Sequence, residues 1–215
     1  MILSEGMRQR GPRDREKKFY EDVAYVLDFL PYGYGVGYPR GGRYQSRPVA
    51  QAVGERYFML LELAPLEGLQ LRVGERISLS GGLEGEVIRV TRRLRYDELT
   101  ASARAELPNA LTEIVKRREK FFVEFFNTAQ PLTTKMHSLE LLRGIGKKTL
   151  WKILEERRKR PFESFEDIRD RIKIDPLRLI VDRIIEELRG EQRHYLFVAP
   201  YRRREWRGER SSPYS

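Results

Sequence analysis

Cysteine is absent from the 215-residue chain, and histidine occurs only twice, as His137 and His194. The lack of thiols excludes disulfides, thiolate zinc sites, iron–sulfur clusters and cysteine nucleophiles. Two histidines so far apart in sequence, without cysteine partners, argue against a metal site or a Ser-His-Asp triad. The acidic residues mostly alternate with basic ones and lack the paired-carboxylate spacing of metal nucleases. We therefore expect no metal, no cofactor and no catalytic residues.

Long apolar runs are also missing. No stretch reaches the length of about 18 apolar residues that a membrane helix needs. The amino terminus is rich in arginine and has no apolar segment of the kind that a secretory signal contains. Hydrophobic residues make up 40% of the chain and aromatic residues 11%, which is typical of a folded protein. The sequence thus predicts a soluble, cytoplasmic protein without a membrane partner.

Basic residues outnumber acidic ones by 42 to 32, for a net charge of +10. The excess is uneven, because residues 1–127 hold 21 basic and 18 acidic residues, whereas residues 128–215 hold 21 and 14. Arginine outnumbers lysine by 32 to 10, and its planar guanidinium suits bidentate contact with phosphate. A surface rich in ion pairs would explain the many charges but not their net sign. The balance favours a polyanionic partner.

The segment 141–154 is the most informative part of the chain. Two apolar stretches flank Gly144-Ile145-Gly146, and two lysines follow directly. Glycine permits a positive φ or a close approach, and a helix that begins near Lys147 would present free amides beside the glycines. The pattern predicts a phosphate-binding turn made by Arg143, Gly144, Ile145, Gly146, Lys147, Lys148, Thr149 and Lys152. The alternative is a tight turn whose lysines only point to water.

The turn resembles the helix-hairpin-helix family, whose pattern is apolar–x–Gly–apolar–Gly at the opening of a second helix. Leu142, Gly144, Ile145 and Gly146 match it position for position. The resemblance implies sequence-nonspecific contact with the phosphate backbone of DNA or RNA. Four helices are expected in this half of the chain, at 134–142, 147–159, 165–172 and 176–188. The last two repeat the arrangement without the Gly-apolar-Gly core, so this second hairpin looks degenerate.

The first half of the chain reads as strands separated by glycine-rich turns. The expected strands are 19–30, 48–53, 56–63, 76–80 and 86–96, which fit a small closed barrel of the oligonucleotide/oligosaccharide-binding (OB) type. Two helices should follow, one over 97–106 that ends before Pro108 and one capped by Asn109 that runs to 127. The predicted fold class is α+β, with a small OB-like β-barrel domain followed by an all-helical helix-hairpin-helix domain. The expected divisions are a basic arm (1–18), the barrel domain (19–130), the hairpin domain (131–200) and an arginine-rich tail (201–215).

The barrel half contributes a second predicted contact surface. In the segment 86–96, basic residues alternate with an apolar face formed by Ile88, Val90, Leu94 and Tyr96. A glycine-rich loop over 31–47 mixes tyrosines with arginines and contains no acidic residue, which suits stacking on unpaired bases. The candidate residues on these two segments are Arg89, Arg93, Arg95, Tyr34, Tyr38, Arg40 and Arg43. A solvated strand face and a purely structural loop are the alternatives.

Two other function classes compete with nucleic-acid binding. Lys148-Thr149 matches locally the hairpin of DNA glycosylase/lyases, in which the lysine is the nucleophile. The later segment Ser-Phe-Glu-Asp-Ile-Arg, at 164–169, does not resemble theirs, and a strand-rich domain replaces their helical body. The third class is a protein-interaction module, which the basic excess disfavours.

The whole arrangement resembles an uncharacterised archaeal family catalogued as domain of unknown function 655 and described as nucleotide- or RNA-binding. The resemblance covers residues from about 17 to 200. It implies a small RNA- or DNA-binding protein linked to translation or ribosome maturation, with RNA favoured over DNA and no known catalytic residues. The sequence leaves open the oligomeric state, the base preference and the cognate nucleic acid.

Overall fold

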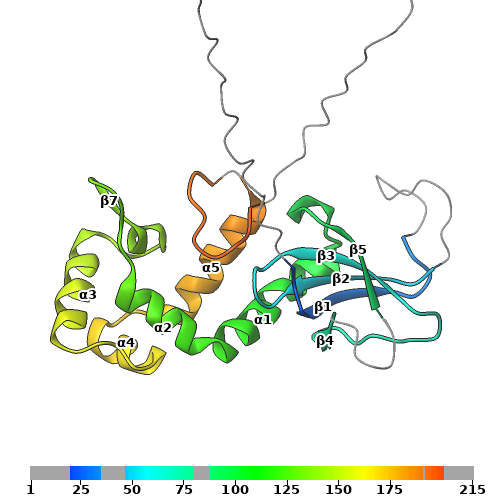
Figure 1. Cartoon of the computed structure of the whole chain (residues 1–215), viewed down its shortest axis with the longest axis horizontal. Coiled ribbons are helices and arrows are strands. Elements are labelled where there is room, and N and C mark those ends of the chain that lie inside the picture. Colours follow the sequence, from blue (N-terminus) through cyan, green and yellow to red (C-terminus); the bar gives the residue numbers. More distant parts are fainter. Residues whose placement is uncertain (1–19, 35–46, 80–87, 191, 201–215) are drawn as a thin grey trace, which may run out of the picture.

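The computed structural model describes residues 20–34, 47–79, 88–190 and 192–200. Strands come first in the chain, as β1 (Val23–Leu30), β2 (Val49–Gly54), β3 (Leu60–Pro65), β4 (Arg76–Ser78) and β5 (Ile88–Arg93). Helices and a small two-stranded hairpin follow, as η1 (Tyr96–Glu98), α1 (Ala101–Arg117), α2 (Glu119–Thr128), β6 (Pro131–Thr133), β7 (Met136–His137), η2 (Ser138–Leu141), α3 (Lys147–Lys159), α4 (Phe165–Ile172) and α5 (Pro176–Arg189). The predicted α+β class is confirmed. The sheet and the helices α3 and α4 lie at opposite ends of the long axis (Figure 1).

The first five strands form one antiparallel sheet in the order β4-β1-β2-β3-β5. Register shifts interrupt the pairing on β1 between Val26 and Asp28, and on β5 beside Thr91. Such bulges increase the local twist, so the sheet curls. Within the described strands no pairing joins β4 to β5. The sheet is therefore a curled half-barrel.

Both faces of this sheet are buried. One face packs against α1, with Tyr25, Leu27, Val53 and Leu60 as its strand residues and Phe58 from the turn before β3. The opposite face forms a second cluster around Ala24, Val26, Ala50, Ala52, Leu61, Leu63, Leu71 and Ile77. Burial on both faces gives β1 a continuous run of buried residues rather than one buried side.

Helix α1 connects the sheet to the rest of the protein, because it packs against β1, β2 and α5. Thr100 caps it by accepting a hydrogen bond from the amide of Ala103. The prediction that the helix ends before Pro108 is wrong, and Asn109 binds Glu106 instead of capping a new helix. A proline inside a helix costs about 3 kcal/mol. The buried side chains of Leu107, Leu111 and Ile114 outweigh this, at about 1.5–3 kcal/mol each.

Three strand boundaries also differ from prediction by three residues or more, and one of them is the start of β1, at Val23 instead of residue 19. β3 begins at Leu60, because the preceding residues form a turn in which Glu21 accepts hydrogen bonds from the amides of Arg56, Tyr57 and Met59. β5 ends at Arg93, and a short 3-10 helix follows. Val90, expected inside, is 42% exposed. The register shift beside it changes which side chains of β5 face inward.

In the second half, the bounds of three helices are as predicted to within one residue: α3, α4 and α5. Ser164 caps α4 by accepting a hydrogen bond from the amide of Asp167. The predicted helix 134–142 is wrong, because β7 and the 3-10 helix η2 lie within that stretch and β6, the partner strand of β7, directly precedes it. This half is consequently not all-helical.

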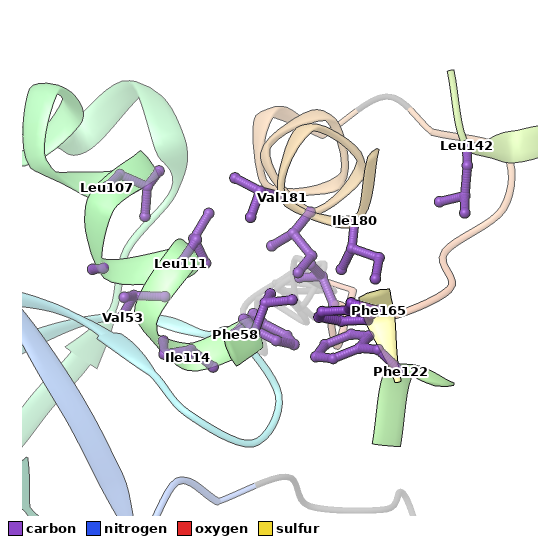
Figure 2. Packing of buried hydrophobic residues seen from close by; sticks show 14 of the residues in the cluster. Val53, Phe58, Leu107, Leu111, Ile114, Phe122, Leu142, Phe165, Ile180 and Val181 are labelled. Carbon is purple, nitrogen blue, oxygen red and sulfur yellow. The ribbon is translucent and has the colours of Figure 1, made fainter. Parts of the chain in front are cut away.

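One apolar cluster runs from the sheet into the helices without a break at residue 130. Figure 2 shows Ile180 and Val181 of α5 between Leu111 of α1 and Leu142, with Phe122 below them. The aromatic rings of Phe122 and Phe125 also pack against Phe197 of the carboxyl-terminal segment. The predicted division into a barrel domain and a hairpin domain stays a prediction. The arms 1–18 and 201–215 lie outside the described residues.

Candidate nucleic-acid interface

The turn between η2 and α3 is held by two buried apolar residues. Leu142 is fully buried and Ile145 is 4% exposed, and the amide of Ile145 donates to the carbonyl of Leu142 at 3.0 Å. Gly144 between them has φ 95°, a conformation that L side chains rarely adopt. The apolar residues of the pattern thus fix the turn to the core, and Gly144 provides its backbone angle.

Gly146 has no comparable structural reason to be glycine. Its φ is −84°, and a Cβ placed on it would meet no described atom within 4 Å. It is the N-cap residue of α3, and among the described residues no side chain caps that helix. The first intrahelical bond runs from the amide of Leu150 to the carbonyl of Gly146. The amides of residues 147–149 are therefore left for water or for a ligand.

Cations surround this amino terminus, but some are already paired. Lys147 contacts Glu140 at 2.7 Å, and Arg143 contacts Glu186 at 2.6 Å. The amide of His137, followed by the ammonium of Lys147, holds the pKa of Glu140 below its ordinary value. Lys148 forms no ion pair with any described carboxylate. The sequence prediction counted the lysines and missed Glu140, which the spacing of seven residues to Lys147 does not reveal.

A buried ion pair on α5 contacts the residues at the start of the turn. Arg183 contacts Glu187 at 2.8 Å and donates to the carbonyl of Leu141 at 3.4 Å. Glu187 also accepts hydrogen bonds from the amides of Leu196, Phe197 and Val198. These contacts join α5, the start of the turn and the carboxyl-terminal segment.

An exposed tryptophan on α3 was not among the predicted site residues. Trp151 is 67% exposed, while Leu150 and Ile153 on either side of it are buried. The helical spacing of the apolar residues Leu150, Ile153 and Leu154 already places position 151 on the outside of this helix. The signal was therefore present in the sequence. Lys152, one residue on, reaches the carbonyl of Ile172 at 3.5 Å.

A second turn, between α4 and α5, has the same order of features as the first: a residue with positive φ, an isoleucine and the N-cap residue of a helix. Lys173 has φ 68° and ψ 42°, Ile174 is half-buried, and Asp175 is the N-cap residue of α5. The carboxylate of Asp175 accepts a hydrogen bond from the amide of Arg178 at 3.4 Å. It also contacts Arg169 at 3.5 Å. The amino terminus of α5 is thus capped by its own negative charge.

The predicted residues of the barrel half do not join this site. Arg93 donates to the carbonyls of Ala199 and Pro200, and Arg95 contacts Asp97 at 2.8 Å. Arg89 is exposed, and Tyr34 donates to Glu62 at 2.9 Å. Tyr38, Arg40 and Arg43 lie outside the described residues. Since β5 and α3 are at opposite ends of the molecule, the candidates form two separate surfaces (Figure 1).

The described residues contain neither a cluster of metal-ligating side chains nor a helix that could span a membrane. Across the described ranges, no group of three or more His, Asp or Glu side chains is arranged to hold a metal ion. None of the described helices combines the length and the apolar character needed to cross a membrane.

The chain is similar to archaeal proteins without an assigned function. Residues 20–199 match the family described as "Protein of unknown function (DUF655)". An uncharacterized protein of Methanocaldococcus jannaschii is 40% identical over 193 residues, which cover 89% of this chain and 86% of that protein. A crystal structure from Archaeoglobus fulgidus, described as a family model of DUF655, has 49% identity and a TM-score of 0.74. The match covers 83% of this chain and 100% of that one, so it extends over both the sheet and the helices.

Proposed function

The chain belongs to the DUF655 family, and we propose that it is a non-catalytic nucleic-acid-binding protein that holds a phosphate backbone at the turn before α3. In this proposal, the segment Leu142–Lys148 is a helix-hairpin-helix turn. The curled sheet is an OB-like half-barrel that offers Arg89 as a further contact. RNA is favoured over DNA because of the family resemblance and the loop rich in tyrosine and arginine.

The observation that carries the proposal is Gly146. Neither its backbone angle nor the space around it requires glycine, and the helix that it starts has no side-chain cap among the described residues. By contrast, Thr100, Ser164 and Asp175 cap α1, α4 and α5. A residue that leaves helix amides bare without a structural reason fits an external acceptor. A phosphate oxygen is the acceptor that such a site prefers.

The charge around α3 supports the same class of ligand. Lys148, Lys152 and Arg158 are exposed and form no ion pair with the described carboxylates, although Glu140 offsets Lys147. Binding to phosphates releases counterions, so affinity should fall as salt rises. The expected slope of log K against log salt is about −0.7 per phosphate neutralised on a single strand.

The lyase class gains no support from the surroundings of Lys148. Asp167, the nearest candidate for a catalytic aspartate in the sequence, contacts Arg160 and Arg171, each at 3.1 Å. No described carboxylate pairs with Lys148. A covalent adduct with abasic DNA after borohydride reduction, lost in Lys148→Ala, would replace our proposal with that activity.

The direct test is Gly146→Asp, measured by fluorescence anisotropy with labelled single-stranded RNA, duplex RNA and duplex DNA. The new carboxylate would occupy the amides and repel phosphate, so affinity should fall by about tenfold or more, which is about 1.4 kcal/mol. Ser102→Asp is the matched control, because it adds the same charge to the exposed first turn of α1. We expect this control to bind like the natural protein.

Three results would contradict the proposal: an affinity that is unchanged in Gly146→Asp, equal losses in both variants, or binding that is flat between about 50 and 200 mM salt. Unchanged affinity in Gly146→Asp would favour the protein-interaction class. Circular dichroism of each variant checks that the fold is retained.

A further inference from the structure

The outer face of α3 is a basic surface with one aromatic residue in its middle. Its exposed side chains are Lys147, Lys148, Trp151, Lys152, Glu155, Arg158 and Lys159. Five of these seven are basic and one is acidic. Lys159 contacts Glu155 and Glu156, so the free positive charge is concentrated near Trp151.

Trp151 does not contribute to the core. Its side chain is 67% exposed, and neither the ring pairs nor the cation–π pairs found among the described residues include it. Residues three and four positions apart are neighbours on a helix surface, so Lys147 and Lys148 lie one turn before the indole. An indole one turn after Lys148, which forms no ion pair with the described carboxylates, matches a ligand that combines a flat ring with negative charge.

An unpaired nucleotide has both of these properties. Bases stack on aromatic side chains regardless of sequence, while the flanking phosphates pair with lysine. A paired base in a duplex is already stacked on both faces and cannot cover the indole. A lipid surface would require a broad apolar face, whereas Trp151 is the one large apolar side chain exposed on the described face of α3.

We infer that Trp151 stacks on an unpaired base of the nucleic acid whose backbone is held beside it, so that the ligand is single-stranded or looped at α3. This inference rests on the proposed function and specifies its ligand. It assigns base contact to Trp151 and phosphate contact to the turn and to Lys148 and Lys152. Duplex segments would then bind through the turn alone.

The test compares Trp151→Ala with Gly146→Asp on three polyanions: oligoadenylate, its duplex with oligouridylate, and inorganic polyphosphate. Loss of one stacked base should lower affinity for oligoadenylate by about 5- to 150-fold. Affinity for polyphosphate, which has no bases, should not change in Trp151→Ala. Trp151→Phe should restore most of the loss, and Phe121→Ala serves as an exposed aromatic control on α2.

A second readout is the fluorescence of Trp151 itself. The chain has two tryptophans, Trp151 and Trp206, so the variant Trp206→Phe reports on Trp151 alone. Oligoadenylate should quench this signal, and polyphosphate should not.

Equal affinity of Trp151→Ala and the natural protein for oligoadenylate would overturn the inference. If Gly146→Asp still weakens binding, the proposed function stands without it; if neither variant matters, both fail. A change in Trp151 fluorescence on addition of anionic phospholipid vesicles, without a change on addition of oligoadenylate, would also overturn the inference, in favour of a membrane surface.

Discussion

The turns before α3 and before α5 have the same order of structural features and opposite electrostatic character. Each has a residue with positive φ, then an isoleucine, then the N-cap of a helix. In the first turn these are Gly144, Ile145 and Gly146; in the second they are Lys173, Ile174 and Asp175. The first leaves its helix uncapped and is followed by two lysines. The second caps its helix with a carboxylate and is followed by Pro176.

The difference separates what the fold needs from what a ligand would need. Both turns connect helical segments and bury or half-bury their isoleucine, so both contribute to the fold. The N-cap residue is glycine with ψ 178° in the first turn and aspartate with ψ 95° in the second, and each starts a helix. The open amino terminus is thus a property of the first turn alone, and substitutions can exchange it.

The largest expected effect concerns the buried ion pair Arg183–Glu187, which contacts the start of the first turn. Arg183→Met should lower the free energy of unfolding by about 3–5 kcal/mol, because it leaves Glu187 buried without its cation. The carbonyl of Leu141, at the entry to the first turn, would also lose its donor. Urea denaturation measures the change.

Arg178→Met is the control for the ion pair Arg183–Glu187. Arg178 lies in the first turn of α5, is exposed, and contacts Asp182 only at 3.8 Å. Its loss should cost less than about 1 kcal/mol. Similar losses of stability in the two variants would show that the buried ion pair contributes no more than an exposed one.

Replacing the residue with positive φ should change the stability of the protein in opposite directions in the two turns. Gly144→Ala should destabilise the protein by about 1–2 kcal/mol, because an L side chain is strained at φ 95°. Lys173→Gly should stabilise it by about 0.5–1 kcal/mol, since the removed strain exceeds the chain entropy that glycine adds. Thermal denaturation of both variants tests the pair. Destabilisation by Lys173→Gly would mean that the positive φ of Lys173 stores no strain that glycine relieves.

Local sequence signals predicted the helices around the second turn well. The bounds of α4 and α5 follow from Ser164 as a cap, from Pro176 at a first helical position and from apolar residues at helical spacing. The start of α3 followed from Gly146 and the lysines. These are interactions between residues close in sequence, so the sequence itself contains them.

Prediction from the sequence failed where contacts between residues far apart in the chain determine the structure. The stretch 134–142 has helical spacing, but Gln130 receives hydrogen bonds from Ser138 and a strand pair forms instead. Arg93 looked free for a ligand, yet it binds carbonyls more than 100 residues away, at a separation of 107 for Pro200. Glu140 neutralises Lys147 through a contact that only the folded turn creates. Such pairings arise from tertiary structure and leave no local pattern.

The entries to the two turns should also respond differently to pH. Burial, followed by the charge of Arg157, lowers the pKa of His137 below its ordinary value of 6.5. Its Nδ1 accepts a hydrogen bond from the amide of Leu139 at 3.1 Å, which caps η2, and protonation would remove that acceptor. Ser164, at the start of α4 before the second turn, does not titrate.

Because the folded protein keeps His137 neutral, its contribution is present above pH 6.5 and is lost as pH falls. The slope is at most about 1.4 kcal/mol per pH unit. Amide exchange near residues 138–142 should accelerate between pH 6.5 and 5.5 after correction for intrinsic rates. His137→Asn should remove this dependence, and His194→Asn should keep it. Equal pH dependence in the variant and the natural protein would exclude His137 as the cause.

The smallest effect on stability is the most informative one for the comparison. Gly146→Asn gives α3 a neutral side-chain cap and should stabilise the protein by a few tenths of a kcal/mol, while Asp175→Gly should destabilise it by a similar amount. Differential scanning calorimetry resolves such shifts when the two variants are measured together. A cap that improves folding but weakens nucleic-acid binding would mean that Gly146 is retained at a cost to stability, which a purely structural turn has no reason to bear. If Gly146→Asn stabilises the protein and leaves binding intact, the bare amides are not the contact, and the two turns differ in sequence but not in function.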